Sequence, residues 1–141
     1  MPLQQDSRTF VLEIARQSEM FSMSIFERDE VASTLKHYSQ LRVVIPQINK
    51  ACQEVTSILN KSNKFSRLET DLMVSLKKTG RFLWDHLLTS EVKDRLFNGT
   101  IKELVLSLDE ELIDIPWELL YDGVEFFCLK FNLGRIYELH W

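Results

Sequence analysis

Glu103-Leu-Val-Leu-Ser-Leu-Asp-Glu-Glu-Leu-Ile-Asp-Ile-Pro-Trp-Glu-Leu-Leu-Tyr-Asp-Gly123 is the stretch that decides the fold of this chain. Its apolar opening, Leu104–Leu108, predicts a strand that is buried on both faces. An acidic turn follows at 109–111, and Leu112–Ile113 is expected to form a second short strand. The residue before Pro116 is biased toward an extended backbone, so a helical turn is expected to begin at the proline.

The residues from Pro116 to Gly123 can all be explained by a structural role. Pro116 suits the first position of a helical turn, and Glu118 then lies where free N–H groups favour a carboxylate. Trp117 and the two leucines can seal an edge of the sheet, while Gly123 can adopt a positive φ and release the chain. We therefore expect a motif that builds the fold, made of Pro116, Trp117, Glu118, Leu119, Leu120, Asp122 and Gly123.

The N-terminal part alternates apolar and polar side chains with a period of two. Thr9–Arg16 and Met20–Glu27 both show this pattern, and Gln17–Glu19 reads as a turn between them. The pattern predicts an antiparallel β-hairpin with one buried face. Because a lone hairpin is only marginally stable in water, it has to pack on another part of the chain.

Helical periodicity dominates the middle of the chain. One helix is predicted from Pro46 to Asn60, and a second from Phe65 to Leu88. Pro46 either starts the regular part of the first helix or kinks it. The short polar loop between them predicts an antiparallel pair, and Gly80 in the second helix suggests close approach of another element. The apolar stripe that predicts the first helix is Leu41, Ile45, Ile48, Cys52, Val55 and Leu59.

A short helix is predicted at Glu91–Phe97, with Ser90 as its N-cap. The chain then returns to strands at Glu103, and a last strand at Phe126–Leu133 is expected to leave an open sheet edge. The predicted fold class is α+β: an N-terminal β-hairpin, an antiparallel helical hairpin, a short helix and C-terminal β segments. The expected organisation is one compact unit, with a β-hairpin region (1–37), the helical hairpin plus short helix (38–98) and the start of a sheet (99–141).

The Pro-Trp-Glu-Leu-Leu turn in this frame resembles the opening of the CHAT domain, a caspase- and separase-like (clan CD) cysteine protease family. The resemblance covers most of the chain from about Gln40 to Arg135, and it implies that 99–141 starts a CHAT-like sheet of a partial caspase-like α/β fold. It also implies that Tyr38–Arg42 belongs to a helical lead-in. The other segments that carry the resemblance are Ile48–Glu54, Lys78–Leu88 and Phe127–Arg135.

The resemblance implies a front end without its active site. CHAT proteases use a His, usually in a Gly-His-Gly context, and a Cys after a later strand, whereas only 18 residues follow the motif here. Cys52 on a helix stripe and Cys128 in an aromatic strand are expected to be inert buried thiols. No catalytic residue, cofactor or metal ligand is therefore predicted. The histidines, none in the family's context, are His37, His86 and His140.

The composition and charge of the chain narrow the range of possible functions further. With 45% hydrophobic residues and only 4 Gly and 3 Pro, the chain favours a packed core. A net charge of −4 without a basic run argues against nucleic acid. Carboxylates could hold a divalent cation, but the acidic cluster Asp109, Glu110, Glu111 and Asp114 lacks the spacing of a calcium loop, so a solvated turn is expected. Neither a signal peptide nor a membrane-spanning run is present, so a cytoplasmic protein without membrane contact is expected.

Two non-enzymatic hypotheses follow. In the first, the chain is a non-catalytic N-terminal fragment or truncated relative of a CHAT-family protease, a scaffold and protein-interaction module whose full-length relatives cleave proteins, often in prokaryotic signalling or defence. In the second, it is a standalone dimerisation or adaptor module with no protease parent. Both predict partners that are proteins or remaining domains of the same polypeptide, and a homodimer through the exposed sheet edge or the helices. A free-standing enzyme is the third hypothesis.

Overall fold

The computed structural model describes residues 8–30, 37–64 and 70–138. Strands and helices are mixed along these residues, which confirms the α+β fold class. In chain order the regular elements are β1 (Thr9–Gln17), β2 (Met20–Glu27), β3 (Ser39–Arg42), α1 (Ile45–Lys64), α2 (Thr70–Leu87), α3 (Ser90–Asn98), β4 (Glu103–Asp109), α4 (Phe127–Lys130) and β5 (Asn132–Glu138), with short 3₁₀ turns at Arg28–Glu30, Glu110–Leu112 and Trp117–Leu119.

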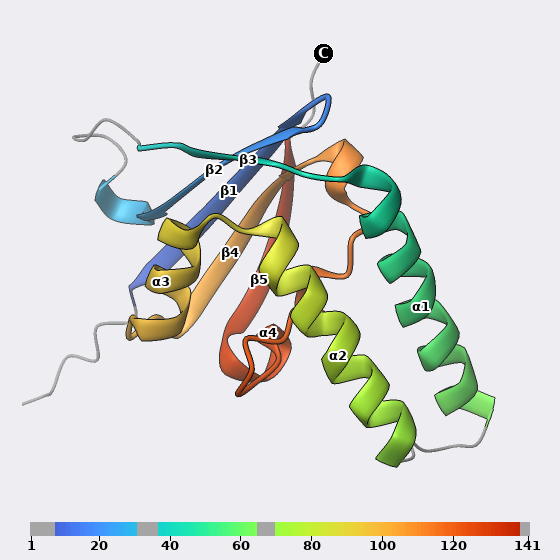
Figure 1. Ribbon diagram of the computed structural model, residues 1–141. Coiled ribbons are helices and arrows are strands. Elements are labelled where there is room, and N and C mark those ends of the chain that lie inside the picture. Colours follow the sequence, from blue (N-terminus) through green and yellow to red (C-terminus); the bar gives the residue numbers. More distant parts are fainter. Residues whose placement is uncertain (1–7, 31–36, 65–69, 139–141) are drawn as a thin grey trace, which may run out of the picture.

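The strands form one mixed sheet with the order β3-β2-β1-β4-β5 (Figure 1). β1 and β2 pair antiparallel as the predicted hairpin, and β3 pairs antiparallel with β2. β4 is parallel to both of its neighbours, so that Leu106 lies beside Leu12 of β1 and beside Arg135 of β5. Parallel strands need long crossover connections, and the segment between β3 and β4 accordingly carries α1, α2 and α3.

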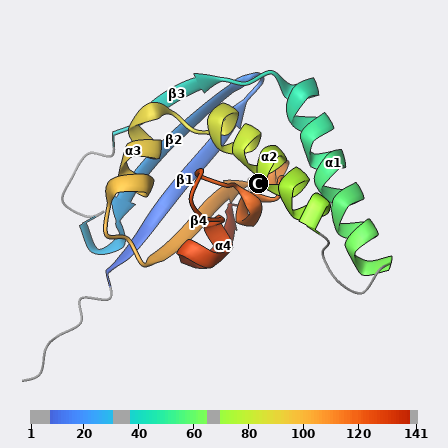
Figure 2. The ribbon, with the colours of Figure 1, turned by 60° about the horizontal axis from the view of Figure 1, so that its bottom comes forward.

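One face of the sheet carries the core. The pleat has a period of two, so alternate residues of β1, β2 and β4 share a face and the registers place them side by side. α2, α3 and α4 lie in front of this face and α1 lies alongside α2, as the views in Figures 1 and 2 show. The side chains buried there include Leu12, Ile14, Phe21, Met23, Leu104, Leu106 and Leu108.

The helices largely follow the predicted pattern. α1 and α2 pack side by side and run in opposite directions (Figure 1). Pro46 lies in the first turn of α1, where no intrahelical N–H donor is needed. The N-cap of α3 is Thr89 and not Ser90: its hydroxyl accepts a hydrogen bond from the Val92 N–H at 3.3 Å. No helix within the described ranges has the length and apolar character needed to cross a bilayer.

The expected helical lead-in at Tyr38–Arg42 is wrong, because Ser39–Arg42 is strand β3. Leu41 sits four residues before Ile45 and so continues the helical stripe in the sequence. In the structure, however, it lies opposite Phe21 in the sheet. A spacing of four therefore arose by chance where a strand passes into a helix.

Two predicted strands are also wrong. Leu112–Ile113 belongs to a turn region that begins with the 3₁₀ turn Glu110–Leu112. The strand expected at Phe126–Leu133 is split: α4 occupies Phe127–Lys130, and the strand β5 starts only at Asn132. Its aromatic content favours a strand, but the four-residue spacing of Phe127 and Phe131 lets their rings pack edge to face, 5.4 Å apart, at the two ends of one helical turn.

Candidate functional site

Trp117 is the buried centre of the Pro-Trp-Glu segment. Its side chain is inaccessible to solvent, and its indole Nε1 donates a hydrogen bond to the Leu112 carbonyl at 3.1 Å. Pro116 directly precedes the 3₁₀ turn that carries the indole. A large aromatic side chain that is fully buried with its N–H satisfied belongs to the core and is not presented to a ligand.

Arg135 of β5 holds the turn in place through Glu118. Its Nε and Nη2 donate to the two carboxylate oxygens of Glu118, each at 2.6 Å. The same guanidinium donates to the carbonyls of Ile113 and Ile115 at 2.9 Å. Bidentate ion pairs of this kind are among the strongest polar contacts in proteins. The contacts thus tie both sides of Pro116 to β5.

Two glycines let the motif approach its neighbours. The Gly80 carbonyl in α2 accepts a hydrogen bond from the Tyr121 N–H at 3.0 Å. A Cβ placed on Gly80 would lie 2.4 Å from the Leu119 carbonyl oxygen, so no side chain fits there, and the expected close approach at this glycine is confirmed. Gly123 has φ of +99°, as its predicted role in the turn requires.

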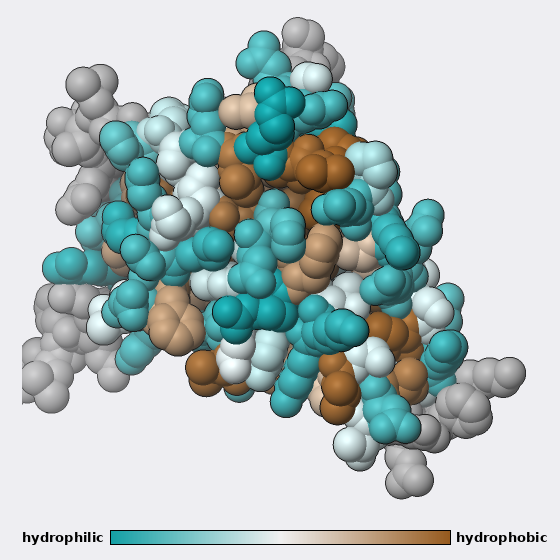
Figure 3. Space-filling model, in the orientation of Figure 1, coloured by the Kyte–Doolittle hydropathy of each residue, from teal (hydrophilic) through white to brown (hydrophobic). Residues whose placement is uncertain are grey.

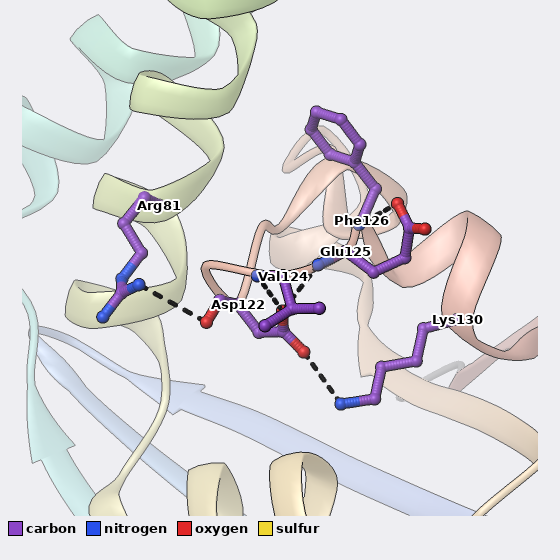
Figure 4. A network of polar contacts seen from close by, with 6 residues as sticks. All are labelled: Arg81, Asp122, Val124, Glu125, Phe126 and Lys130. Atoms are coloured by element: carbon purple, nitrogen blue, oxygen red, sulfur yellow. Dashed lines mark hydrogen bonds and ion pairs between the residues drawn. The ribbon is translucent and has the colours of Figure 1, made fainter.

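Asp122 organises the loop between the motif and α4 (Figure 4). One of its carboxylate oxygens accepts hydrogen bonds from the N–H groups of Val124 and Glu125, each at 2.8 Å. The other accepts from Lys130 Nζ of α4 at 2.8 Å, and the Asp122 side chain is only 1% exposed. Arg81 of α2 donates to the Asp122 carbonyl at 3.4 Å. The loop is therefore tied to two helices.

The pKa values of the Glu118 and Asp122 carboxyl groups are both lowered in the folded chain. Burial alone would raise the pKa of Glu118, but the hydrogen bonds and charge of Arg135 outweigh it, so the pKa is lowered. The same balance holds at Asp122: burial raises its pKa, and the Lys130 ammonium with two backbone N–H groups lowers it further than burial raises it. The Glu118 carboxylate in turn raises the pKa of Arg135. Both carboxyl groups are therefore ionised at neutral pH.

These shifts predict a loss of stability in acid. A carboxyl group with a lowered folded-state pKa contributes stability that is complete above its ordinary value, about 3.9 for Asp and 4.3 for Glu, and is lost as the pH falls through the folded value. We expect the free energy of unfolding to decrease as the pH is lowered from about 4.5. Urea titrations between about pH 3 and pH 7 measure this.

A variant with Asp122→Asn and Glu118→Gln should be less stable at neutral pH and should lose much less stability on acidification. Its matched control is Asp85→Asn, which removes one partner of an exposed i,i+4 pair on α2 with Arg81 and should keep the wild-type slope. Parallel pH profiles for the double variant and the wild type would contradict the assignment.

Both cysteine thiols have a pKa above the ordinary cysteine value. Cys52 is half-buried in α1, and burial followed by the nearby charge of Asp114 raises its pKa. Cys128 is exposed on α4, so the prediction of a buried strand thiol is wrong: the helix turns Phe127 inward and Cys128 outward. Partial burial, and after it the negative charge of Glu118, raises the pKa of the Cys128 thiol. A raised pKa leaves less of the reactive thiolate.

The described histidines are engaged elsewhere. His86 Nδ1 lies 2.9 Å from the Phe82 carbonyl, and its ring stacks on the Phe82 ring with centroids 4.1 Å apart. His37 Nε2 lies 3.6 Å from a Glu91 carboxylate oxygen. His140 lies outside the described residues. Both described imidazoles therefore have neighbours other than a thiol.

The acidic turn has a structural use. The Asp109 carboxylate accepts a hydrogen bond from the backbone N–H of Arg16 at 2.8 Å. The side-chain Nε of Arg16 lies 3.8 Å from a carboxylate oxygen of Glu111. The turn thus secures the end of β1. Across residues 8–30, 37–64 and 70–138, no group of three or more His, Cys, Asp or Glu side chains is placed to hold a metal ion.

β5 forms one border of the sheet. In the part of the chain that the structure describes, its one neighbouring strand is β4. Ile136 and Tyr137 on β5 are 53% and 46% exposed, and a Cβ placed on Gly134 would meet no atom within 4 Å. An edge strand with exposed apolar side chains can pair with a further strand.

Sequence reasoning placed the motif but missed its partners. Arg135 lies 17 residues after Glu118, Lys130 lies 8 after Asp122, and Arg81 lies 41 before it. None of these separations belongs to a helix or hairpin spacing that a single sequence reveals. The resembling segment Phe127–Arg135 contains two of the three, but it gave no role for either.

No protein-family model, no curated protein and no solved structure matches this chain.

Proposed function

We propose that this chain is a non-catalytic scaffold and protein-interaction module, the front part of a CHAT-like protease fold. Its sheet receives further β-structure at the β5 edge. The added strand comes from a protein partner or from other parts of the same polypeptide, and in the isolated chain a second copy can supply it.

The contacts of the motif support a scaffold role. Trp117 is buried, Glu118 is paired with Arg135, and Asp122 is paired with Lys130, so each side chain is used inside the fold. Cys52 and Cys128 both have raised thiol pKa values, which disfavours a cysteine nucleophile at neutral pH.

The sheet topology also supports the proposal. A purely antiparallel meander would argue against a caspase-like sheet, and β4 is instead parallel to both β1 and β5. Parallel sheets typically continue through several strands, with covering layers built from crossover helices. A parallel edge strand such as β5 is thus a suitable position for the sheet to grow.

The exposure of Ile136 and Tyr137 on β5 carries the proposal. We expect the purified chain to self-associate weakly through this strand, with sedimentation velocity showing a larger species as the concentration rises toward about 100 μM. Ile136→Lys places a charge on the edge and should shift the chain to monomer, because natural edge strands use lysine to block pairing.

Val124→Lys is the matched control, since Val124 is 72% exposed in the loop before α4 and off the sheet. This variant should associate like the wild type. A wild-type chain that stays strictly monomeric over the whole range, or an Ile136→Lys variant that associates unchanged, would count against β5 as the receiving edge.

The second hypothesis, a standalone dimerisation module, rests on the same exposed strand. It differs in stoichiometry, because two identical edges related by a two-fold axis form a closed dimer that does not grow further. A tight dimer that persists on dilution to about 1 μM favours this hypothesis, and weak association favours a scaffold that awaits other strands.

A further inference from the structure

A second surface, on the helical hairpin and remote from β5 in the chain, has the features of a binding groove. It runs between α1 and α2, is open to solvent and has a volume of about 770 Å³. Figure 3 shows brown, apolar side chains between the two helices, at the lower right of the view. Residues from Gln47 to Lys61 of α1 and from Ser75 to His86 of α2 line it. A helix rises 1.5 Å per residue, so the groove is about 20 Å long.

The floor of the groove is apolar and its walls are basic. Phe82 is partly exposed, and Ala51 and Ile58, which are 5% and 7% exposed, close the bottom of the groove between the helices, while Lys50 and Lys61 on α1 and Lys78 on α2 lie along its length. The single acidic side chain of the lining is Glu54, which accepts a hydrogen bond from the Thr79 hydroxyl at 3.3 Å. Three lysines thus face one carboxylate that is already engaged within the groove.

The ion pairs of the described residues involve other cations, and none of them includes Lys50, Lys61 or Lys78. Elsewhere in the same fold a lysine that matters structurally is paired, as Lys130 is with Asp122. The groove therefore offers an unneutralised positive charge above an apolar floor.

The backbone of the walls decides which kind of partner fits. The N–H and C=O groups of α1 and α2 are satisfied within each helix, so the groove cannot accept an added strand as β5 can. A helix satisfies its own backbone and can place apolar side chains at i, i+3, i+4 and i+7 onto such a floor. The flanking positions of that helix would meet the lysines.

We propose that the groove between α1 and α2 binds an acidic amphipathic helix, presented by a protein partner, which completes a three-helix arrangement. Its apolar stripe lies on Ala51, Ile58 and Phe82, and its glutamates or aspartates face Lys50, Lys61 and Lys78. About 13 residues of helix match the 20 Å length of the groove. This site is separate from the β5 edge and does not depend on it.

The test uses a fluorescein-labelled synthetic peptide of about 16 residues, with leucines at helical spacing and glutamates beside them. Fluorescence anisotropy should show saturable binding to the full chain that weakens as salt is raised from about 50 to 300 mM. A peptide with the same composition in scrambled order, and one with lysines in place of the glutamates, should each bind at least about 10-fold more weakly.

Charge-reversal variants locate the site. Lys50→Glu with Lys78→Glu changes one residue on each helix and should weaken binding about 10-fold or more. Lys93→Glu with Lys102→Glu makes the same change of net charge outside the groove lining and should alter affinity less than about twofold. Circular dichroism confirms that both variants keep the wild-type fold.

Amide chemical shifts give an independent readout. The peptide should perturb residues of α1 and α2 that line the groove and leave β5 unaffected, and Ile136→Lys should bind it normally. No saturable binding up to about 1 mM, equal binding of the lysine peptide, unchanged affinity of the groove variant, or perturbations centred on β5 would each overturn the proposal.

Discussion

Replacing Trp117 with alanine is expected to lower the free energy of unfolding by about 4–6 kcal/mol. Truncating a buried Trp typically costs about 3–5 kcal/mol, and losing the indole N–H leaves the buried Leu112 carbonyl without its donor. Domains of this size have only about 5–15 kcal/mol in total, so the variant should be barely folded. Urea unfolding followed by far-ultraviolet circular dichroism measures the change.

Two controls separate the contributions of the indole. Trp117→Phe keeps an aromatic ring but removes the N–H donor, and should cost about 1–3 kcal/mol. Val124→Ala truncates a side chain that is 72% exposed and should change stability by less than about 0.5 kcal/mol. A loss below about 1 kcal/mol for the alanine variant would mean that Trp117 is not a core residue.

Gly80→Ala is expected to destabilise the chain by about 2–3 kcal/mol, although glycine to alanine inside a helix usually stabilises by about 1 kcal/mol. The new Cβ would lie 2.4 Å from the Leu119 carbonyl oxygen and 3.1 Å from the Tyr121 Cβ. Relief of that overlap requires α2 to move away from the motif, which stretches the hydrogen bond from the Tyr121 N–H to the Gly80 carbonyl. Thermal and urea unfolding both report the effect.

Gly134→Ala on β5 is the matched control for this substitution. Its added Cβ would meet no atom within 4 Å, and the residue does not have a positive φ. The control should be neutral or slightly stabilising, because alanine restricts the unfolded chain more than glycine does. If Gly80→Ala were also stabilising, the close packing of α2 against Leu119 would be contradicted.

The elements that the sequence predicted are those with a local signal. The alternation of Thr9–Arg16 and Met20–Glu27 identified the hairpin, and helical periodicity identified α1 and α2. The predicted start of the second helix, at 65–69, lies outside the described residues. Gly80 and Gly123 also behaved as expected, because close approach and positive φ are conformational demands that glycine meets better than other residues. Such features depend on a few neighbouring positions.

The incorrect predictions concern segments whose conformation depends on contacts with distant parts of the chain. β3 and α4 were misassigned because their sequences fit the wrong periodicity, and the neighbouring elements decided their conformation. The edge-to-face packing of Phe127 on Trp84, with ring centroids 5.7 Å apart, is one such contact. Arg135 and Lys130 have no local signature at all, since a surface arginine or lysine and a partner that pairs with a motif look alike in a single sequence.

The two proposed surfaces also differ in how far the sequence could predict them. An open edge at the last predicted strand was expected, although the strand itself begins six residues later than predicted, at Asn132. The groove between α1 and α2 had no sequence counterpart, because its lysines come from two helices and only the packing of those helices brings them together.

Amide hydrogen exchange of β5 tests the receiving edge most directly. The wild-type chain is compared with Ile136→Lys at protein concentrations from about 5 to 200 μM, where mass action favours pairing. If β5 accepts a further strand, the amides of 132–138 exchange more slowly as the wild-type concentration rises, and the variant shows no such change. Exchange rates at β5 that stay the same over the full range, in a chain whose core amides remain protected, would contradict this role.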